Sequence, residues 1–296
     1  MLEQTLKSVV GQNYENFEIV IADGGSTDNT LKLAQQLLGD KLIVASRSDV
    51  GQLDGILKAL GAATGDICYF LNADDIVLPG SFDHVVKIFT QSSEIDFVFS
   101  DDFAFSSEKR ELYVAPTIRF LTRTEHEIFY RQLYSECVFF RRSIWDGSSD
   151  WVNLNLRVYT DYEFFLNILH GKKGRWTDKR LGAFRIVNGQ MSQIFGDRKS
   201  QEYDDVKRRF FRRFAGRDTP TVWKTVHAWP RFFALNLLWP VLERSVRKGY
   251  RVITRDKRRK MQVAAFFTWI EGNIADGKNN QDDPSNYVNL QRILHR

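Results

Sequence analysis

The stretch "DICYFLNADD", residues 66–75, determines which fold and which chemistry we expect of this chain. The apolar run "ICYF" predicts a buried strand that continues to the end of the stretch. There it meets Asp74 and Asp75, two neighbouring carboxylates that repel each other and raise each other's pKa. A positive charge is therefore expected beside this pair.

Strand and helix patterns alternate on both sides of this stretch. Apolar stripes and turn residues predict helices at 2–10, 27–38, 52–63 and 79–90, and strands at 17–23 and 41–46. Their short links indicate an α/β fold in which helices flank a mostly parallel sheet.

Beyond residue 95 the pattern becomes less regular. It predicts a strand–turn–strand at 96–105, helices at 124–133 and 158–171, and a strand at 181–187. From about residue 197 the chain is helical, basic and aromatic. We therefore expect a core domain over 1–197 and a helical, basic C-terminal extension over 198–296.

Composition narrows the class of protein. The 296 residues include 42 Lys and Arg and 37 Asp and Glu, and this mild basic excess fits an anionic substrate, a membrane surface or nucleic acid. Cys68 and Cys137 lie in apolar runs and are expected as buried thiols, which indicates a reducing compartment. No run approaches the roughly 18–20 apolar residues of a membrane-spanning helix.

Two acidic motifs follow predicted strands, where ligands bind in a parallel α/β sheet. In "ADGGSTDNT", residues 22–30, Asp23 is placed to accept a hydrogen bond from a base or ribose, although taken alone the motif is better explained as a turn and a helix cap. In "NADD", the carboxylate pair suits a hard divalent cation shared with phosphates; the alternative is a solvated turn. Together the motifs predict a nucleotide site next to a metal–diphosphate site.

The combined motifs resemble family 2 glycosyltransferases, which have the GT-A fold. The resemblance runs collinearly from about residue 3 to 195, through "DGGSTDNT", "DVGQLDGILKALGAATGDICYFLNADDIVLPGSF", "FFRRSIW", "YTDYEFFLNIL" and "FRIVNGQMS". It implies an inverting transferase that moves a sugar from a nucleotide-diphosphate donor to a glycan or lipid-linked acceptor in polysaccharide or cell-envelope biosynthesis.

The resemblance also implies roles for five acids. Asp23 would bind the nucleotide base, Asp54 would line the donor pocket, and Asp74 would lie near the sugar or ribose. Asp75, the last acid of the DXD-like motif, would contact Mn²⁺ or Mg²⁺. Asp161 would be the catalytic base that takes the acceptor's proton.

Several alternatives stay open. Glu163 is a rival base, although two residues along a helix it points well away from Asp161. The chain could instead be a catalytically inactive remnant or binding protein with the same fold, or, less in keeping with the Asp161 helix, a nucleotidyltransferase. Weaker site candidates, each matched by an ordinary surface or capping role, are Asp49, Lys58, Asp101, Asp102, Trp145 and Arg185.

The sequence departs from the family in three places, one of which is the irregular acceptor loop over residues 145–156. Family members usually carry a first strand before the first helix, and the chain starts inside that helix. We therefore expect unpaired strand edges in the middle of the sheet. Val187 stands where many relatives have a histidine.

The C-terminal stretch 229–260 joins an aromatic, apolar segment to a basic one. This pattern is typical of helices that lie on anionic lipid, and equally of a helical cap with a solvated basic face. We expect a cytoplasmic protein with no nucleic-acid partner. Peripheral contact with the inner face of the membrane is a hypothesis for this stretch.

Overall fold

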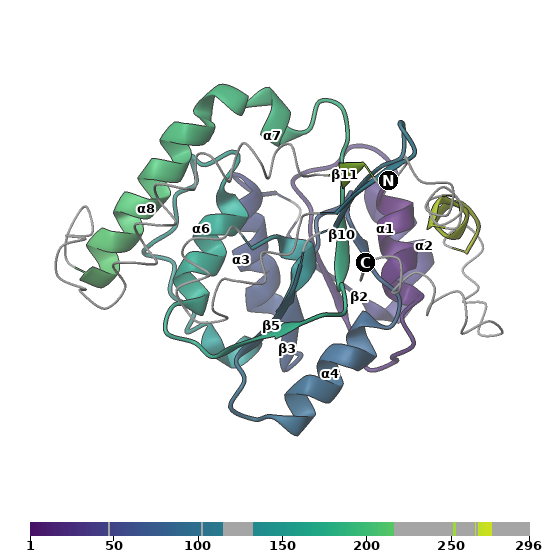
Figure 1. Ribbon diagram of the computed structural model, residues 1–296, viewed down its shortest axis with the longest axis horizontal. Coiled ribbons are helices and arrows are strands. Elements are labelled where there is room, and N and C mark those ends of the chain that lie inside the picture. Colours follow the sequence, from purple (N-terminus) through teal and green to yellow (C-terminus); the bar gives the residue numbers. More distant parts are fainter. Residues whose placement is uncertain are drawn as a thin grey trace.

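The computed structural model describes residues 1–46, 48–101, 103–114, 133–215, 251–252, 264 and 266–273. Sheets in the middle of the molecule are flanked by helices, with α1 and α2 on one side and α3, α6 and α8 on the other (Figure 1). The helices are α1 (Leu2–Val10), α2 (Thr30–Leu38), α3 (Gln52–Ala62), α4 (Ser81–Gln91), α6 (Thr160–Leu169), α7 (Met191–Ile194) and α8 (Lys199–Ala215).

The first sheet contains the parallel strands β1 (Ile19–Ala22) and β2 (Leu42–Ser46). Leu6 of α1 and Ala34 and Leu38 of α2 pack together against one of its faces, and α3 contacts both strands. Among the described strands, β1 is hydrogen-bonded to β2 alone and does not join β3. In the residues that the structure describes, the β1-β2 sheet is thus separate from the other two sheets.

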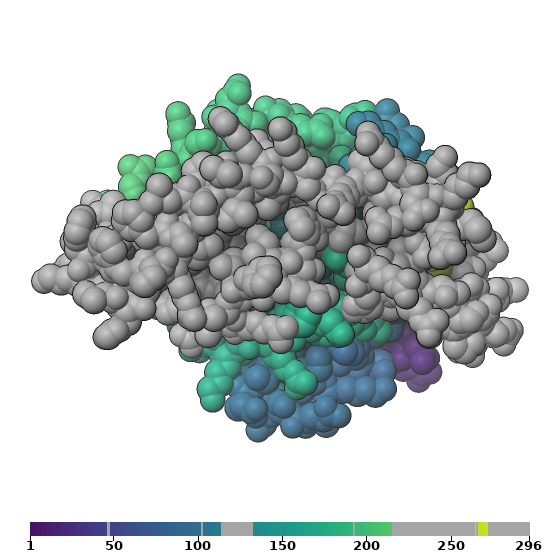
Figure 2. All heavy atoms as spheres, viewed as in Figure 1, coloured from purple at the N-terminus to yellow at the C-terminus, as the bar shows by residue number. Residues whose placement is uncertain are grey.

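The second sheet has the order β3-β8-β5-β9 and is buried on both faces. Its strands are β3 (Ile67–Tyr69), β8 (Val138–Arg141), β5 (Phe97–Ser100) and β9 (Gly174–Thr177). Since successive side chains of a strand point to opposite faces, Phe97 and Phe99 join the core under α3, α6 and α8. Val98 between them packs on α4, together with Phe139. In the space-filling view of this side, α4 forms the lower edge and the green residues of α7 and α8 line the upper edge (Figure 2).

The third sheet has the order β11-β7-β6-β10-β4. The end of its strand β10 contacts the loop that carries the acid pair. Its strands are β11 (Arg251–Val252), β7 (Glu111–Val114), β6 (Phe103–Ser106), β10 (Gly182–Arg185) and β4 (Ile76–Val77). Phe103 and Phe105 of β6 pack with Phe266 and Phe267 in a separate apolar cluster.

Buried polar side chains of α1 and of the turn after it hold the backbone between residues 73 and 82. Thr5 Oγ1 donates to the Ala73 carbonyl (2.9 Å), and Ser8 Oγ accepts from the Val77 N–H (3.2 Å). Gln12 Nε2 donates to the Leu78 carbonyl (3.1 Å), while its Oε1 accepts from two N–H groups at the start of α4. Since the first N–H groups of a helix have no partner within it, Gln12 acts as the N-terminal cap of α4.

Three expectations from the sequence need correction. The strand predicted to continue through residue 75 ends at Tyr69, and the acids lie on the loop that follows, which is closed by a hydrogen bond from the Asp75 N–H to the Asn72 carbonyl (3.2 Å). The sheets are mixed rather than mostly parallel: five of the eight pairings between described strands are antiparallel. Strands β7, β8 and β9 are not among the predicted elements.

The other predicted elements are present within a few residues of their expected bounds. The helix predicted at 124–133, the residue Asp102 and the stretch 229–260 lie wholly or almost wholly outside the described residues. Cys68 and Cys137 are buried free thiols, as predicted.

We predict that Gln12→Ala lowers the free energy of unfolding by about 2 kcal/mol, because it removes the hydrogen bonds of the Gln12 amide to the backbone of residues 78, 81 and 82 and leaves only the 3.3 Å bond from the Ser81 N–H to the Leu78 carbonyl. Denaturant unfolding measures the change. Gln36→Ala on the exposed face of α2 is the matched control and should change stability by less than about 0.5 kcal/mol. Equal losses in both variants would contradict the capping role.

Candidate active site

The carboxylate of Asp75 is fully buried on the loop between β3 and β4. Its Oδ1 accepts from the backbone N–H of Arg185 (2.9 Å), and its Oδ2 accepts from Asn72 Nδ2 (3.0 Å). Burial, with the adjacent charge of Asp74, raises the pKa of Asp75 to about 7. Burial also raises the pKa of Asp74, which is partly exposed. A nearby cation therefore stabilises the ionised form of this pair.

Arg185, at the end of β10, supplies one positive charge. Its Nε donates to the Asp74 carbonyl (2.6 Å), its Nη1 donates to Ser107 Oγ (2.9 Å), and its guanidinium lies 4.6 Å from the ring centroid of Phe105. The side chain is 3% exposed, and its Nη2 has no hydrogen-bond partner among the described residues. Arg185, only a weak candidate from the sequence, is thus part of the acid site.

The acid pair also has the chemistry of a divalent-cation site. Two neighbouring carboxylates offer the hard oxygen atoms that Mg²⁺ and Mn²⁺ prefer. Within the described part of the chain, no group of three His, Cys, Asp or Glu side chains could hold a metal without further ligands. An ion bound at Asp74 and Asp75 would therefore need further oxygen ligands from water or a bound molecule.

A line of hydrogen bonds connects the acid pair to the start of α6. Asn72 Oδ1 accepts from Gln52 Nε2 (2.8 Å), and Gln52 Oε1 accepts from Thr160 Oγ1. Asn72 Nδ2 also donates to Ser135 Oγ (3.1 Å). Since Thr160 immediately precedes Asp161, the loop after β3, the start of α3 and the start of α6 meet in one place.

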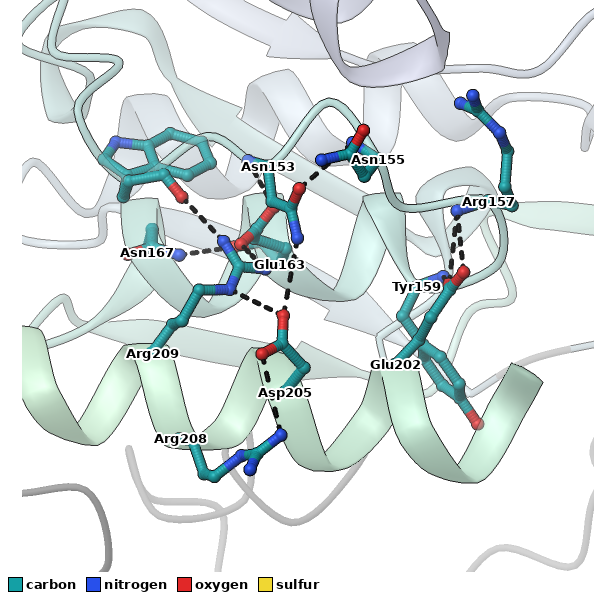
Figure 3. A network of polar contacts seen from close by, with 11 residues as sticks. Asn153, Asn155, Arg157, Tyr159, Glu163, Asn167, Glu202, Asp205, Arg208 and Arg209 are labelled. Carbon is teal, nitrogen blue, oxygen red and sulfur yellow. Dashed lines mark hydrogen bonds and ion pairs between the residues drawn. The ribbon is translucent and has the colours of Figure 1, made fainter.

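Asp161 and Glu163 leave α6 in different directions. Asp161 is half-buried in the first turn, where its Oδ1 accepts from the Tyr162 N–H (2.8 Å). Glu163 is fully buried, forms an ion pair with Arg209 of α8 and accepts from the Asn153 N–H (3.2 Å). Figure 3 shows Glu163 directed toward α8. This geometry favours Asp161 over Glu163 as the base.

Asp23 and Asp54, which the resemblance assigns to donor binding, organise their own loops. The buried carboxylate of Asp23 accepts from the N–H groups of Gly25 (3.1 Å) and Ser26 (2.9 Å) and from Ser26 Oγ (2.6 Å). The hydroxyl of Ser26 is the main cause of a lowered pKa at Asp23. Asp54 Oδ2 accepts from the Val50 N–H (3.0 Å) and pairs with Lys58 Nζ (2.7 Å).

Asp49 lies against the turn of Asp23. Its Oδ1 accepts from the Gly51 N–H (3.0 Å), and a Cβ added to Gly24 would lie 3.0 Å from its Oδ2. Glycine at position 24 thus allows the loops after β1 and β2 to touch. The contacts of Asp23 and Asp54 are those of a turn and a helix cap. Asp49 joins them at this edge of the site.

Four of the connecting residues were not identified from the sequence. Gln52, Asn72, Ser135 and Thr160 carry the hydrogen bonds between the acid pair and α6. Asn72 and Gln52 lie inside the quoted motifs "NADD" and "DVGQLD", and this position was the only available signal. No sequence pattern distinguishes Ser135 and Thr160 from ordinary loop and helix-start residues.

The fold agrees with the comparisons to known proteins. Residues 1–145 match the family model described as glycosyl transferase family 2. A PGL/p-HBAD biosynthesis glycosyltransferase of Mycobacterium bovis is 30% identical over 168 residues, which are 55% of this chain and 62% of the relative. The chain therefore spans less than two thirds of the length of this relative.

Solved structures show the same architecture. S. aureus TarS 1-349 in complex with UDP has a TM-score of 0.55 at 13% identity, over 99% of this chain and 86% of that chain. The mannosyltransferase PcManGT from Pyrobaculum calidifontis, in complex with GDP-Man and Mn²⁺, has a TM-score of 0.53 at 13% identity, over 99% and 80%. The fold is that of the GT-A glycosyltransferases. Residues 1–145 belong to glycosyl transferase family 2.

We predict that Glu163→Gln stabilises the protein at high pH and not at low pH. Burial raises the pKa of Glu163 from 4.5 to about 7, so the folded protein holds this proton more tightly than the unfolded chain. The stability from the protonated carboxyl is present below about pH 4.5 and is lost as the pH rises through about 7. The variant and parent should match at pH 4.5, and the variant should gain about 3 kcal/mol at pH 8.

Denaturant unfolding at the two pH values measures this difference. Glu94→Gln, at an exposed glutamate beyond α4, is the control. Its difference in unfolding free energy from the parent should be the same at both pH values. A Glu163→Gln variant less stable than its parent at pH 8 would show that the ion pair with Arg209 outweighs the cost of burial.

Proposed function

We propose that this chain is an inverting, metal-dependent transferase that moves a sugar from a nucleoside-diphosphate donor to an acceptor hydroxyl. The observation that supports it most is the line of hydrogen bonds from Asp75 through Asn72 and Gln52 to Thr160. It brings an acid pair suited to a metal–diphosphate group next to the helix turn that carries Asp161. A transferase needs these two parts side by side, because donor and acceptor react in one step.

Each acid then has a role in the proposal. Asp161 takes the proton from the acceptor hydroxyl as that oxygen attacks the anomeric carbon. Asp75 would hold Mn²⁺ or Mg²⁺, with Asp74 beside it near the sugar or ribose, and the bound ion would stabilise the departing diphosphate. Asp23 and Asp54 line the donor side, where Asp23 shapes the turn that meets the base.

The donor and pathway are proposed from the relatives. TarS structures contain UDP or UDP-GlcNAc, and PcManGT contains GDP-Man. The mycobacterial relative acts in PGL/p-HBAD biosynthesis. We accordingly propose a nucleotide-sugar donor, a glycan or lipid-linked acceptor and a role in cell-envelope biosynthesis. In the part of the chain that the structure describes, every helix is too short or too polar to cross a bilayer.

The domain assignment and the location of the protein remain part of this proposal. A catalytic unit over 1–197 carries the site, with 198–296 as an extension. A cytoplasmic location with membrane contact through 229–260 would bring the site to a lipid-linked acceptor.

We expect calorimetric titration with UDP, GDP, dTDP and CDP to show binding of one nucleotide that depends on Mn²⁺. Asp75→Ala should lose this metal dependence, because it removes the buried carboxylate of the acid pair. Asp66→Ala, at an exposed aspartate just before β3, is the control and should bind as the parent does. A folded parent that binds none of the four nucleotides would overturn the proposed function, and binding without turnover would favour the inactive binding protein.

We expect Asp161→Asn to lower kcat by about 10²- to 10⁴-fold while nucleotide affinity stays unchanged, because the amide cannot accept the acceptor's proton. Steady-state release of the nucleotide diphosphate measures kcat, and titration measures affinity. Glu163→Gln, at the rival acid on the same helix, is the comparison, and its kcat should fall less. A larger loss of kcat in Glu163→Gln than in Asp161→Asn would reverse the assignment of the base.

A further inference from the structure

Helix α8 presents two different faces to the rest of the protein. Val206 and Phe210 are buried in the core under α6, and the ring of Tyr203 stacks on Tyr162 at 5.4 Å between centroids. A second, polar face carries Glu202, Asp205, Arg209 and Arg213. Their spacing of three, four and four residues places them along one side of a helix.

This polar face follows the irregular segment 150–159 in the antiparallel sense. Arg213 Nη1 pairs with Asp150 (2.9 Å), Arg209 Nη1 donates to the Trp151 carbonyl (3.2 Å), and Asp205 Oδ2 accepts from Asn153 Nδ2 (3.4 Å). Arg209 also pairs with Glu163, and Figure 3 shows how these contacts converge from α8. The segment before α6 is therefore held at successive turns of α8.

Glu202 makes the last of these contacts, directly before the proposed base. Its carboxylate accepts from the backbone N–H groups of Arg157 (3.1 Å) and Tyr159 (3.4 Å), both drawn in Figure 3, and from that of Val158 (2.9 Å). Hydrogen bonds from N–H groups to a carboxylate are stronger than those between neutral groups. One side chain thus fixes three consecutive peptide groups.

The start of α6 depends on this outside support. Its N-cap residue is Tyr159, which makes no side-chain capping bond. A carboxylate near a helix N-terminus is also favoured by the helix dipole. Glu202 therefore holds, from α8, the three residues that lead into α6, and Thr160 and Asp161 follow at once.

Residues 157–160 also contact the donor side of the site. A Cβ added to Gly51, the residue before α3, would lie 3.4 Å from Arg157 Nη1. Thr160 donates to Gln52 in the first turn of α3, and Gln52 continues to Asn72 and Asp75. A shift of residues 157–159 would therefore move Asp161 relative to the acid pair.

We propose that Glu202 is a positioning residue for the transfer reaction: by holding the N–H groups of residues 157–159, it sets the place of Asp161 opposite the acid pair. This inference rests on the proposed function, in which Asp161 is the base. Glu202 is not needed for the packing of α8 on the core, because Tyr203, Val206 and Phe210 make those apolar contacts. Removing the carboxylate should therefore alter the reaction more than the fold.

The test compares Glu202→Ala and Glu202→Gln with Asp204→Asn in the full chain. Asp204 is an exposed acid on α8, two positions along from Glu202 and off the polar face. UDP-N-acetylglucosamine and GDP-mannose with Mn²⁺ serve as donors, with water as the acceptor, and release of the nucleotide diphosphate gives kcat and the donor KM. The stoichiometry of UDP or GDP binding counts folded sites, and amide hydrogen exchange follows residues 155–162.

In Glu202→Ala we expect kcat to fall about 10- to 100-fold, because small displacements of a catalytic group have effects of this size. The donor KM and the binding stoichiometry should stay within about twofold of Asp204→Asn, and exchange at 155–162 should rise. The kcat of Glu202→Gln should lie between those of Glu202→Ala and Asp204→Asn, since glutamine keeps one oxygen acceptor.

Three outcomes would overturn the inference. Glu202→Ala with the kcat of Asp204→Asn and full binding would show that Glu202 does not position the base. Unchanged exchange at 155–162 would show that it does not hold the segment. A parent chain that binds nucleotide but releases none from either donor would remove the proposed function and with it the role in the reaction, while the exchange result would still decide whether Glu202 anchors the loop.

Discussion

The burial of the Asp75 carboxylate is the constraint on which the site depends. A charge that is removed from water needs several polar partners. Asp75 finds them in the Arg185 backbone, the Asn72 amide and the nearby guanidinium of Arg185. To supply them, the end of β10 must lie against the loop after β3. The same amide of Asn72 reaches Ser135, and its oxygen reaches Gln52, so that satisfying one carboxylate sets the mutual position of several elements.

The loop that carries Asp75 is held in place by hydrogen bonds with α1. Most helices of this size turn an apolar stripe to the core, and α1 does so with Leu6 and Val9. It also buries Thr5 and Ser8, and the turn after it buries Gln12; the hydrogen bonds of these three side chains satisfy backbone groups between Ala73 and Phe82. Irregular backbone can be buried only where such partners exist. These side chains explain how a short strand, a loop with two acids and the start of α4 can follow one another inside the protein.

The sequence predicts the local features of this structure better than the long-range ones. Helices α1, α3 and α4 and the acid pair follow from periodicity and motif. Strand β8 does not, because its antiparallel place between β3 and β5 depends on pairing with residues that lie about forty to seventy positions earlier. Arg185 illustrates the same limit at the site: its contact with Asp75 joins residues 110 positions apart. Asp23 and Asp54 were predicted as site residues, but only the structure shows that their oxygens are already engaged by their own loops.

The two acids of α6 show how a helix can serve the core and the site at once. Positions two apart on a helix are separated by about 200°, so Glu163 and Asp161 point to different surroundings. Glu163 is buried against α8, where the ion pair with Arg209 and the Asn153 N–H fix the rotation of α6 about its axis. Glu202 fixes where that helix begins. Once rotation and starting point are set, the direction of Asp161 is no longer free. Glu163, the buried acid that the sequence offers as a rival base, thus helps to orient Asp161.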